Sequence, residues 1–242
     1  ILEFSRRDVR WCQGNMQYVK LLDQPGLKPI SRFQLLWAIL MFVGVPAWTL
    51  MIALSPFLAW HGPSREAFPV GFAATVYVIF FLMYLMPKIA GFTDILMTEG
   101  GTDRYGGRAH FLGAAATELV FSFLLGALTS FRITVFMIGL AFGKSVTWGG
   151  QQRDAMALSW REAWDAFWPQ MAFGWAVFGL LWLASPAAAL WSLPLTAGFL
   201  IAVPFAVFTA SPALGRFFVS HRLCGIPEEF DMPDEIARAR RS

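Results

Sequence analysis

The sequence predicts an all-α fold, a polytopic transmembrane helical domain with cytosolic interfacial helices. Of the 242 residues, 57% are hydrophobic and 14% are charged, whereas soluble domains carry about 25% charged residues. Aromatic residues make up 16% and include 11 Trp and 24 Phe, which is typical of proteins with aromatic belts at the bilayer surfaces. Several apolar runs exceed the about 20 residues that one helix needs to cross a bilayer. We therefore expect residues 30–210 to form four to six spans.

An amphipathic segment at 1–29 precedes these runs. Ser5, followed three residues later by Asp8, is a helix-start signal, and the turn pair Pro25–Gly26 cannot continue a helix. We expect a cytosolic interfacial helix between these signals. Its apolar face recurs at helical spacing and consists of Val9, Cys12, Met16 and Val19.

Arg7, Arg10 and Trp11 lie three and four residues apart and should form one cluster on another face of this helix. Guanidinium groups match phosphate oxygens, and an indole ring offers a flat stacking platform. A basic amphipathic helix that lies on anionic lipid explains the same pattern. The spacing alone favours this lipid-surface interpretation.

The first two spans are expected at 34–60, where Pro46 and Pro56 can introduce kinks, and at 69–86. A polar interfacial segment follows at 89–109. It should hold a short helix at 89–97 and then a glycine-rich mobile loop.

The next apolar stretch, 111–142, is too long for one upright span and short for two. Thr129 to Arg132 interrupts it, so we expect two short spans at 110–127 and 133–146, or a re-entrant or interfacial pair. Either solution returns the chain to the side that it left.

A second interfacial segment is expected at 144–167. Ser159 and Glu162 form a capping box, and the helix that they begin should carry an aromatic stripe at the membrane surface, formed by Trp160, Trp164 and Phe167.

Two further spans follow at 171–184 and 191–210, joined by Ser185–Pro186. Residues 211–242 form a cytosolic tail, most simply a disordered one.

Charge predicts the orientation and excludes several classes of protein. With cytosolic ends, 17 of the 19 Lys and Arg residues lie inside, against only Arg65 and Arg132 outside, which satisfies the positive-inside rule.

The net charge of +3 is too small to indicate nucleic-acid binding. Cys12 and Cys224 should remain reduced in the cytosol, and the three scattered His residues show no metal-ligand spacing. Since the chain begins at Ile1 without Met and has no cleavable signal peptide, we expect a fragment of a longer polypeptide.

The string from Arg6 to Asn15, Arg-Arg-Asp-Val-Arg-Trp-Cys-Gln-Gly-Asn, resembles the glucans biosynthesis glucosyltransferase H family. Within it, Arg7-x-x-Arg10-Trp11 is similar to the Q/R-x-x-R-W motif of processive membrane glycosyltransferases such as cellulose synthases. Further likeness lies at Trp148, at Gln151 to Asp154, and at Pro227-Glu228-Glu229. This resemblance reverses the order of the two interpretations of the first helix.

The resemblance implies the C-terminal membrane portion of an inverting family-2 glycosyltransferase. Such enzymes transfer glucose from UDP-glucose with the help of a divalent metal, Mg or Mn, held by an Asp-x-Asp motif in a GT-A domain. This chain has no Asp-x-Asp, so we expect the catalytic base and metal ligands upstream of Ile1, with no catalytic residue and no metal ligand here. Arg10 would contact the diphosphate and Trp11 would stack under the acceptor sugar. Arg7 stands where cellulose synthases have Gln.

The implied parent protein polymerises glucose into the linear β-1,2 backbone of osmoregulated periplasmic glucans in the bacterial inner membrane and helps to export it. Its expected partners are membrane lipid, the nascent glucan and, by resemblance, acyl carrier protein. Glu118 lies within an apolar run, so it is a candidate for the glucan path; pairing with a neighbouring helix is the simpler interpretation. The rival hypotheses are a transporter or channel and a non-catalytic membrane scaffold.

Overall fold

The computed structural model describes the whole chain except residues 63–69, 148–156, 224 and 240–242. The described part is helical and contains no strand, which confirms the predicted all-α fold. Within this described part, four helices are long and apolar enough to cross a membrane, and a bent pair of helices raises this number to five. The chain divides into two compact units, which we describe separately.

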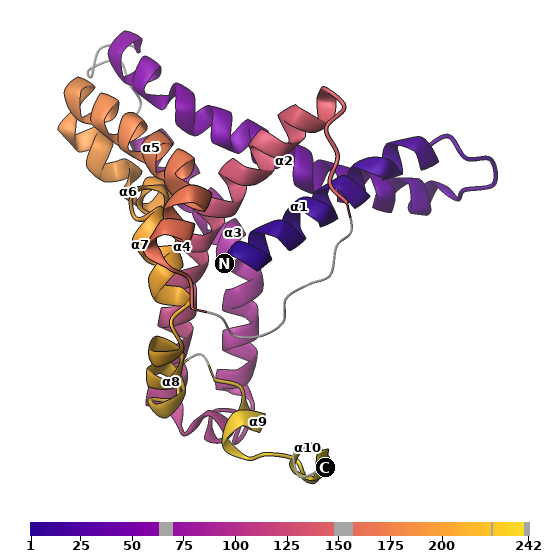
Figure 1. Ribbon diagram of the computed structural model, residues 1–242, viewed down its shortest axis with the longest axis vertical. Coiled ribbons are helices and arrows are strands. Elements are labelled where there is room, and N and C mark those ends of the chain that lie inside the picture. Colours follow the sequence, from indigo (N-terminus) through magenta and orange to yellow (C-terminus); the bar gives the residue numbers. More distant parts are fainter. Residues whose placement is uncertain (63–69, 148–156, 224, 240–242) are drawn as a thin grey trace. The chain divides into compact units, whose positions relative to one another are not determined.

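Unit 1 comprises Ile1–His61 and Ser122–Pro212. Its helices are α1 (Leu2–Met16), the short 3-10 helix η1 (Gln17–Leu21), α2 (Pro29–His61), the second part of α4 (Arg108–Ala141), α5 (Trp160–Ala184), α6 (Pro186–Leu200) and α7 (Ala202–Thr209). Helix α5 packs against α2, α6 and α7, and Figure 1 shows α5 and α6 side by side. The core of this unit therefore lies around α5.

Two clusters of buried side chains form the core of unit 1. The first joins Phe167 of α5 to Leu128 of α4 and Phe205 of α7. The second joins Val177 of α5 to Phe199 of α6. Phe167, Leu128 and Phe199 are completely inaccessible to solvent, so these clusters hold the helices together.

Glycines allow two close helix crossings in unit 1. A Cβ at Gly174 of α5 would clash with the Cβ of Phe199, and a Cβ at Gly198 of α6 would clash with the carbonyl oxygen of Leu124. Small residues at crossings allow close backbone approach, which is a main source of helix association in membranes. These positions set the spacing of α4, α5 and α6.

Helices α6 and α7 are bent by 54° relative to each other, so the stretch where a span is predicted, 191–210, contains a break. Pro204 has no N–H group, which leaves the carbonyl oxygen of Leu200, four residues earlier, without its helical donor. The indole Nε1 of Trp175 on α5 donates to this oxygen at 3.2 Å. The break is therefore satisfied by a neighbouring helix.

Pro56 inside α2 shows the same physical chemistry on a smaller scale. Its missing N–H would leave the carbonyl oxygen of Ile52 without a donor. The Ser55 hydroxyl donates to that oxygen at 2.7 Å. This bond satisfies the carbonyl at Pro56, and α2 continues through both of its prolines.

Helix α4 is a single helix of 34 residues, so the predicted interruption at 129–132 is wrong. The Thr129 hydroxyl donates to the carbonyl oxygens of Leu125 and Gly126 at 3.2 and 3.1 Å, and Ser130 donates to Ala127 at 2.8 Å. Since these hydroxyls bond within their own helix, no polar group forces the chain to turn. The chain runs through 129–132 without the expected hairpin.

Helix α5 begins at the predicted capping box. The Ser159 hydroxyl accepts a hydrogen bond from the Glu162 backbone N–H, and the Glu162 carboxylate accepts one from the Ser159 N–H. The helix then continues through Pro169 to Ala184, so the expected separate interfacial helix is wrong. Phe167 is buried, whereas Trp160, Trp164 and Trp168 are about half exposed. The exposed stripe therefore contains Trp168 in place of Phe167.

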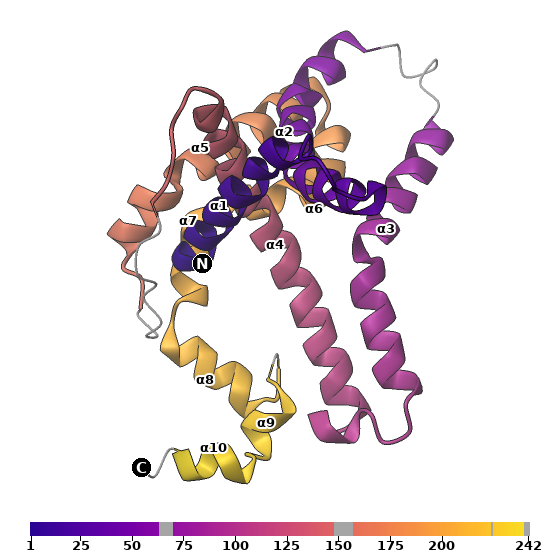
Figure 2. The same cartoon turned by 90° about the vertical axis from the view of Figure 1, so that its right-hand side faces the viewer.

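Unit 2 comprises Gly62–Phe121 and Ala213–Ser242. Its helix α3 (Val70–Met97) continues through Pro87, so the expectation of a separate helix at 89–97 is wrong. The loop that follows holds the 3-10 helix η2 (Asp103–Tyr105) and leads into the first part of α4. Figure 2 shows this loop joining α3 to α4.

The tail of unit 2 forms α8 (Pro212–Ser220), α9 (Pro227–Phe230) and α10 (Asp234–Ala239), so the expectation of a disordered tail is wrong in the described residues. Arg104 of the glycine-rich loop pairs with Glu228 at 3.4 Å. Gly106, at φ +87°, lies so close to Arg222 that a Cβ would be 2.7 Å from its guanidinium. The loop and the tail thus pack on each other.

Candidate site on the first helix

Helix α1 begins at Leu2, and its N-cap is Ile1. Ser5 lies inside the helix and is only 1% exposed, so the prediction that Ser5 caps the helix is wrong. Ser5, Val9 and Cys12 form the buried face. Leu2 packs against the core cluster around Phe167. The first turn of α1 is therefore anchored in the core of unit 1.

Arg7 and Trp11 share the outer surface of α1. The Arg7 guanidinium lies 5.9 Å from the centre of the Trp11 ring and 4.3 Å from that of Phe4, which suits cation–π attraction. The Trp11 side chain is 59% exposed. This surface offers a guanidinium and an aromatic ring next to each other.

Arg10 does not join this surface, because its residue is only 8% exposed. Helical spacing places positions 7, 10 and 11 near one another, but the packing of α1 buries position 10. The structure thus brings Arg7 and Trp11 together on the outer surface and buries Arg10. The ligand contacts assigned to the three residues remain predictions.

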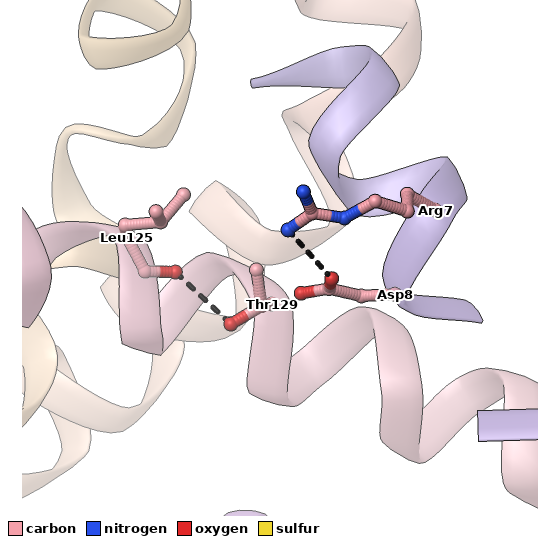
Figure 3. Close-up of polar contacts among 4 residues, drawn as sticks. All are labelled: Arg7, Asp8, Leu125 and Thr129. Atoms are coloured by element: carbon pink, nitrogen blue, oxygen red, sulfur yellow. Dashed lines mark hydrogen bonds and ion pairs between the residues drawn. The ribbon is translucent and has the colours of Figure 1, made fainter. Parts of the chain in front are cut away.

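Burial affects the acid–base chemistry of α1. Burial raises the pKa of the Asp8 carboxyl above its ordinary value, and Arg7 opposes this shift from 3.5 Å. Burial also raises the pKa of the Cys12 thiol to about 11, so this free cysteine is an inert core residue. Figure 3 shows the Arg7–Asp8 pair and, as a separate contact, the hydrogen bond from Thr129 to Leu125 within α4.

Gln13 is a residue that the sequence analysis missed. Its Nε2 donates to the carbonyl oxygen of Val146 at 3.0 Å, and its Oε1 accepts from the Val146 N–H at 2.7 Å. This pair of bonds ties the C-terminal half of α1 to the segment after α4. No local pattern could reveal it, because the partners are 133 residues apart.

Replacing Gln13 should loosen the segment around Val146. Gln13→Leu removes both hydrogen bonds and leaves two part-buried backbone groups without partners, which costs about 1–3 kcal/mol. We expect amide exchange in residues 142–147 to become about tenfold faster or more, measured by hydrogen–deuterium exchange. Gln17→Leu, at an exposed position, is the matched control. Unchanged exchange in Gln13→Leu would contradict the role of this clamp.

Glu118 of α4 pairs with Lys88 of α3 within unit 2. Both side chains remain partly exposed, at 47% for Glu118 and 33% for Lys88. The pair matches the simpler interpretation, a carboxylate paired with a neighbouring helix. A role for Glu118 on a glucan path remains a prediction.

The other residues singled out in the sequence do not form a site in the described structure. The described residues contain no group of three His, Cys, Asp or Glu side chains that could hold a metal ion. Cys224, Trp148 and the stretch from Gln151 to Asp154 lie outside the described residues. The exposed Arg7–Trp11 surface is therefore the main candidate site.

Fold and surface together define a helical protein with several helices long and apolar enough to cross a membrane, and with a basic, aromatic helix before the first of them. Proteins called glucans biosynthesis glucosyltransferase H resemble it over nearly its whole length, which confirms the resemblance seen in the sequence. The protein from Pectobacterium carotovorum is 30% identical and that from Pseudomonas putida 27%; each alignment covers 98% of this chain and 29% of the relative. The protein from Xanthomonas euvesicatoria is 27% identical over 96% of this chain and 38% of its own length.

The chain thus spans about a third of the length of these curated relatives, and it matches their C-terminal part. No protein-family model matches the chain. No solved structure matches it either.

Proposed function

We propose that this chain is the membrane portion of an inner-membrane glucosyltransferase. The parent protein would polymerise glucose from UDP-glucose into the β-1,2 backbone of osmoregulated periplasmic glucans and help to export it. The names of the relatives support the glucosyltransferase and the glucan product. The apolar helices support a membrane location.

The observation that carries the proposal is the exposed Trp11 ring beside the Arg7 guanidinium. An exposed indole can stack on the apolar face of the acceptor sugar. A neighbouring guanidinium can offset negative charge on the departing diphosphate. We assign the acceptor to Trp11 and the diphosphate to Arg10, as the resemblance implies, with Arg7 as a second, exposed contact.

The donor site, the catalytic base and a divalent metal would belong to a nucleotide-binding domain outside this chain. The residues of this chain would hold the product end in place. The spans of unit 1 would then offer the growing glucan a route through the membrane. The proposal therefore concerns the full-length protein.

The test is UDP-glucose incorporation into polymer by membranes that carry the full-length protein. Trp11→Ala should remove nearly all incorporation, and Trp11→Phe, which keeps a ring, should retain part of it. Trp37→Ala is a matched control, since Trp37 on α2 is also 59% exposed. Normal polymerisation by a well-inserted Trp11→Ala protein would overturn the proposal and favour a transporter, channel or scaffold.

A further inference from the structure

Gln13 of α1 uses both ends of its amide on the backbone of one residue. Its Nε2 donates to the carbonyl oxygen of Val146 at 3.0 Å, and its Oε1 accepts from the Val146 N–H at 2.7 Å. Because hydrogen bonds are directional, two of them between the same partners fix an angle as well as a distance. Both ends of the amide are turned to the protein, which indicates a clamp and not a ligand contact.

The partner of this clamp is held at the end of a long helix. Helix α4 ends in a Schellman motif, in which the Lys144 N–H donates to the carbonyl oxygen of Gly139 at 2.9 Å. Gly143 supplies the left-handed conformation that this motif requires, at φ +84°. Val146 follows Lys144 by two residues, so Gln13 ties α1 to a capped helix end.

Apolar contacts hold the part of α1 that precedes the clamp. Leu2 packs on the core cluster around Phe167, and Val9 and Cys12 line the buried face of the helix. Hydrophobic contacts are non-directional, so they hold α1 against the core but leave it some freedom to rotate about its own axis. The two hydrogen bonds of Gln13 add the directional contact that fixes this rotation.

The direction of the Trp11 side chain depends on that rotation. Trp11 lies two residues before Gln13, which is about 3 Å along the helix axis and about 200° around it. At about 5–6 Å from the axis, a rotation of about 10° moves a side chain by about 1 Å. A misplacement of about 1 Å can slow a reaction between oriented groups by about 100-fold. A small rotation of α1 is therefore enough to matter for chemistry at Trp11.

We propose that Gln13 is a positioning residue of glucosyl transfer, because its clamp on Val146 fixes the direction in which Trp11 presents its ring to the acceptor sugar. The inference rests on the proposed function, in which Trp11 stacks under that sugar. In the transfer, the acceptor hydroxyl forms a bond to the anomeric carbon of UDP-glucose and gives its proton to the catalytic base, while the bond to the diphosphate oxygen breaks and UDP leaves. When the acceptor is misplaced, water reacts in its stead and the products are free glucose and UDP.

The first measurement is the number of UDP molecules that the full-length protein releases for each glucose that it incorporates into polymer. This ratio does not depend on how much of the protein is folded, so a loss of stability alone leaves it unchanged. In Gln13→Leu water should compete with the acceptor, and the ratio should rise about threefold or more. Gln17→Leu, which replaces an exposed glutamine four residues later, should leave the ratio unchanged.

The second measurement reports the rotation of α1 and needs no glucan synthesis. Cys12 precedes Gln13 in the chain and is fully buried, so N-ethylmaleimide should label it only slowly in the unmodified protein. In Gln13→Leu the labelling of Cys12, followed by mass spectrometry of its peptide, should become about tenfold faster. Gln17→Leu should again match the unmodified protein.

The two measurements together decide the proposal. A rise in both quantities supports it. Faster labelling of Cys12 with an unchanged ratio would overturn it, because α1 would then move without consequence for the acceptor. An unchanged labelling rate would overturn it as well, because the clamp would not hold α1. Should Gln13→Leu fail to fold, Gln13→Glu, which keeps the acceptor for the Val146 N–H and loses the donor, is judged by the same measurements.

Failure of this inference can be told apart from failure of the proposed function. Loss of polymer in Trp11→Ala together with an unchanged ratio in Gln13→Leu would remove the role of Gln13 and leave the proposed function intact. Normal polymerisation by Trp11→Ala would overturn the proposed function, and the role of Gln13 with it.

Discussion

Gly174→Ala should separate α5 from α6 and destabilise unit 1. The new Cβ would clash with the Cβ of Phe199 and lie 2.9 Å from its carbonyl carbon and 3.0 Å from the backbone nitrogen of Leu200. Backbone atoms cannot rotate away, so the helices themselves must shift. Overpacking of this kind costs about 1–3 kcal/mol. Thermal unfolding in detergent, followed by circular dichroism, measures the loss.

Gly179→Ala is the matched control for this prediction. Gly179 lies on the same helix, and nothing stands within 4 Å of the position of its Cβ. Alanine favours the helix there by about 0.5–1 kcal/mol, so this variant should be as stable as the unmodified protein or more so. Equal stability of the two variants would show that α5 and α6 do not approach as closely as in this structure.

Phe167→Ala should produce the largest loss of stability of any single side chain that we consider. Phe167 is fully buried and joins α5 to Leu128 of α4 and Phe205 of α7. Truncating a buried Phe to Ala costs about 3–5 kcal/mol, because contacts are lost and a cavity remains. Because Leu2 packs on the same cluster, α1 should also become more sensitive to limited proteolysis.

Trp168→Ala is the control, because the neighbouring Trp168 is 49% exposed. It should lower the melting temperature far less than Phe167→Ala does, and Phe167→Leu should fall between them. The sequence pattern alone predicts Phe167 on a surface stripe with Trp160 and Trp164. A mild effect of Phe167→Ala, similar to that of Trp168→Ala, would restore that interpretation.

The position of α1 matters for the proposed function. The motif helix is held at its start by Leu2 in the core and near its end by Gln13 on Val146. Between these anchors, Arg7 and Trp11 lie next to each other on the outer surface. A rigid helix with two anchors suits a site that must present an aromatic ring and a guanidinium in fixed positions.

Local chemistry allowed several features to be predicted from the sequence by itself. Apolar runs of sufficient length predict helices that can span a membrane, because the backbone must satisfy its own hydrogen bonds there. The Ser159–Glu162 cap and the helix break at Ser185–Pro186 depend only on neighbouring residues, and both are observed. The ten-residue string around Trp11 was enough to indicate the relatives.

Only the tertiary structure decided which helices continue and which residues face the core. Helix α4 continues through the expected break at Thr129, and the bend at Pro204 is satisfied by Trp175 of another helix. Likewise the burial of Arg10 and Phe167, and the meeting of Gln13 with Val146, depend on packing between segments far apart in the chain. Helical periodicity determines which residues share a face, but contacts with other helices determine which face is buried.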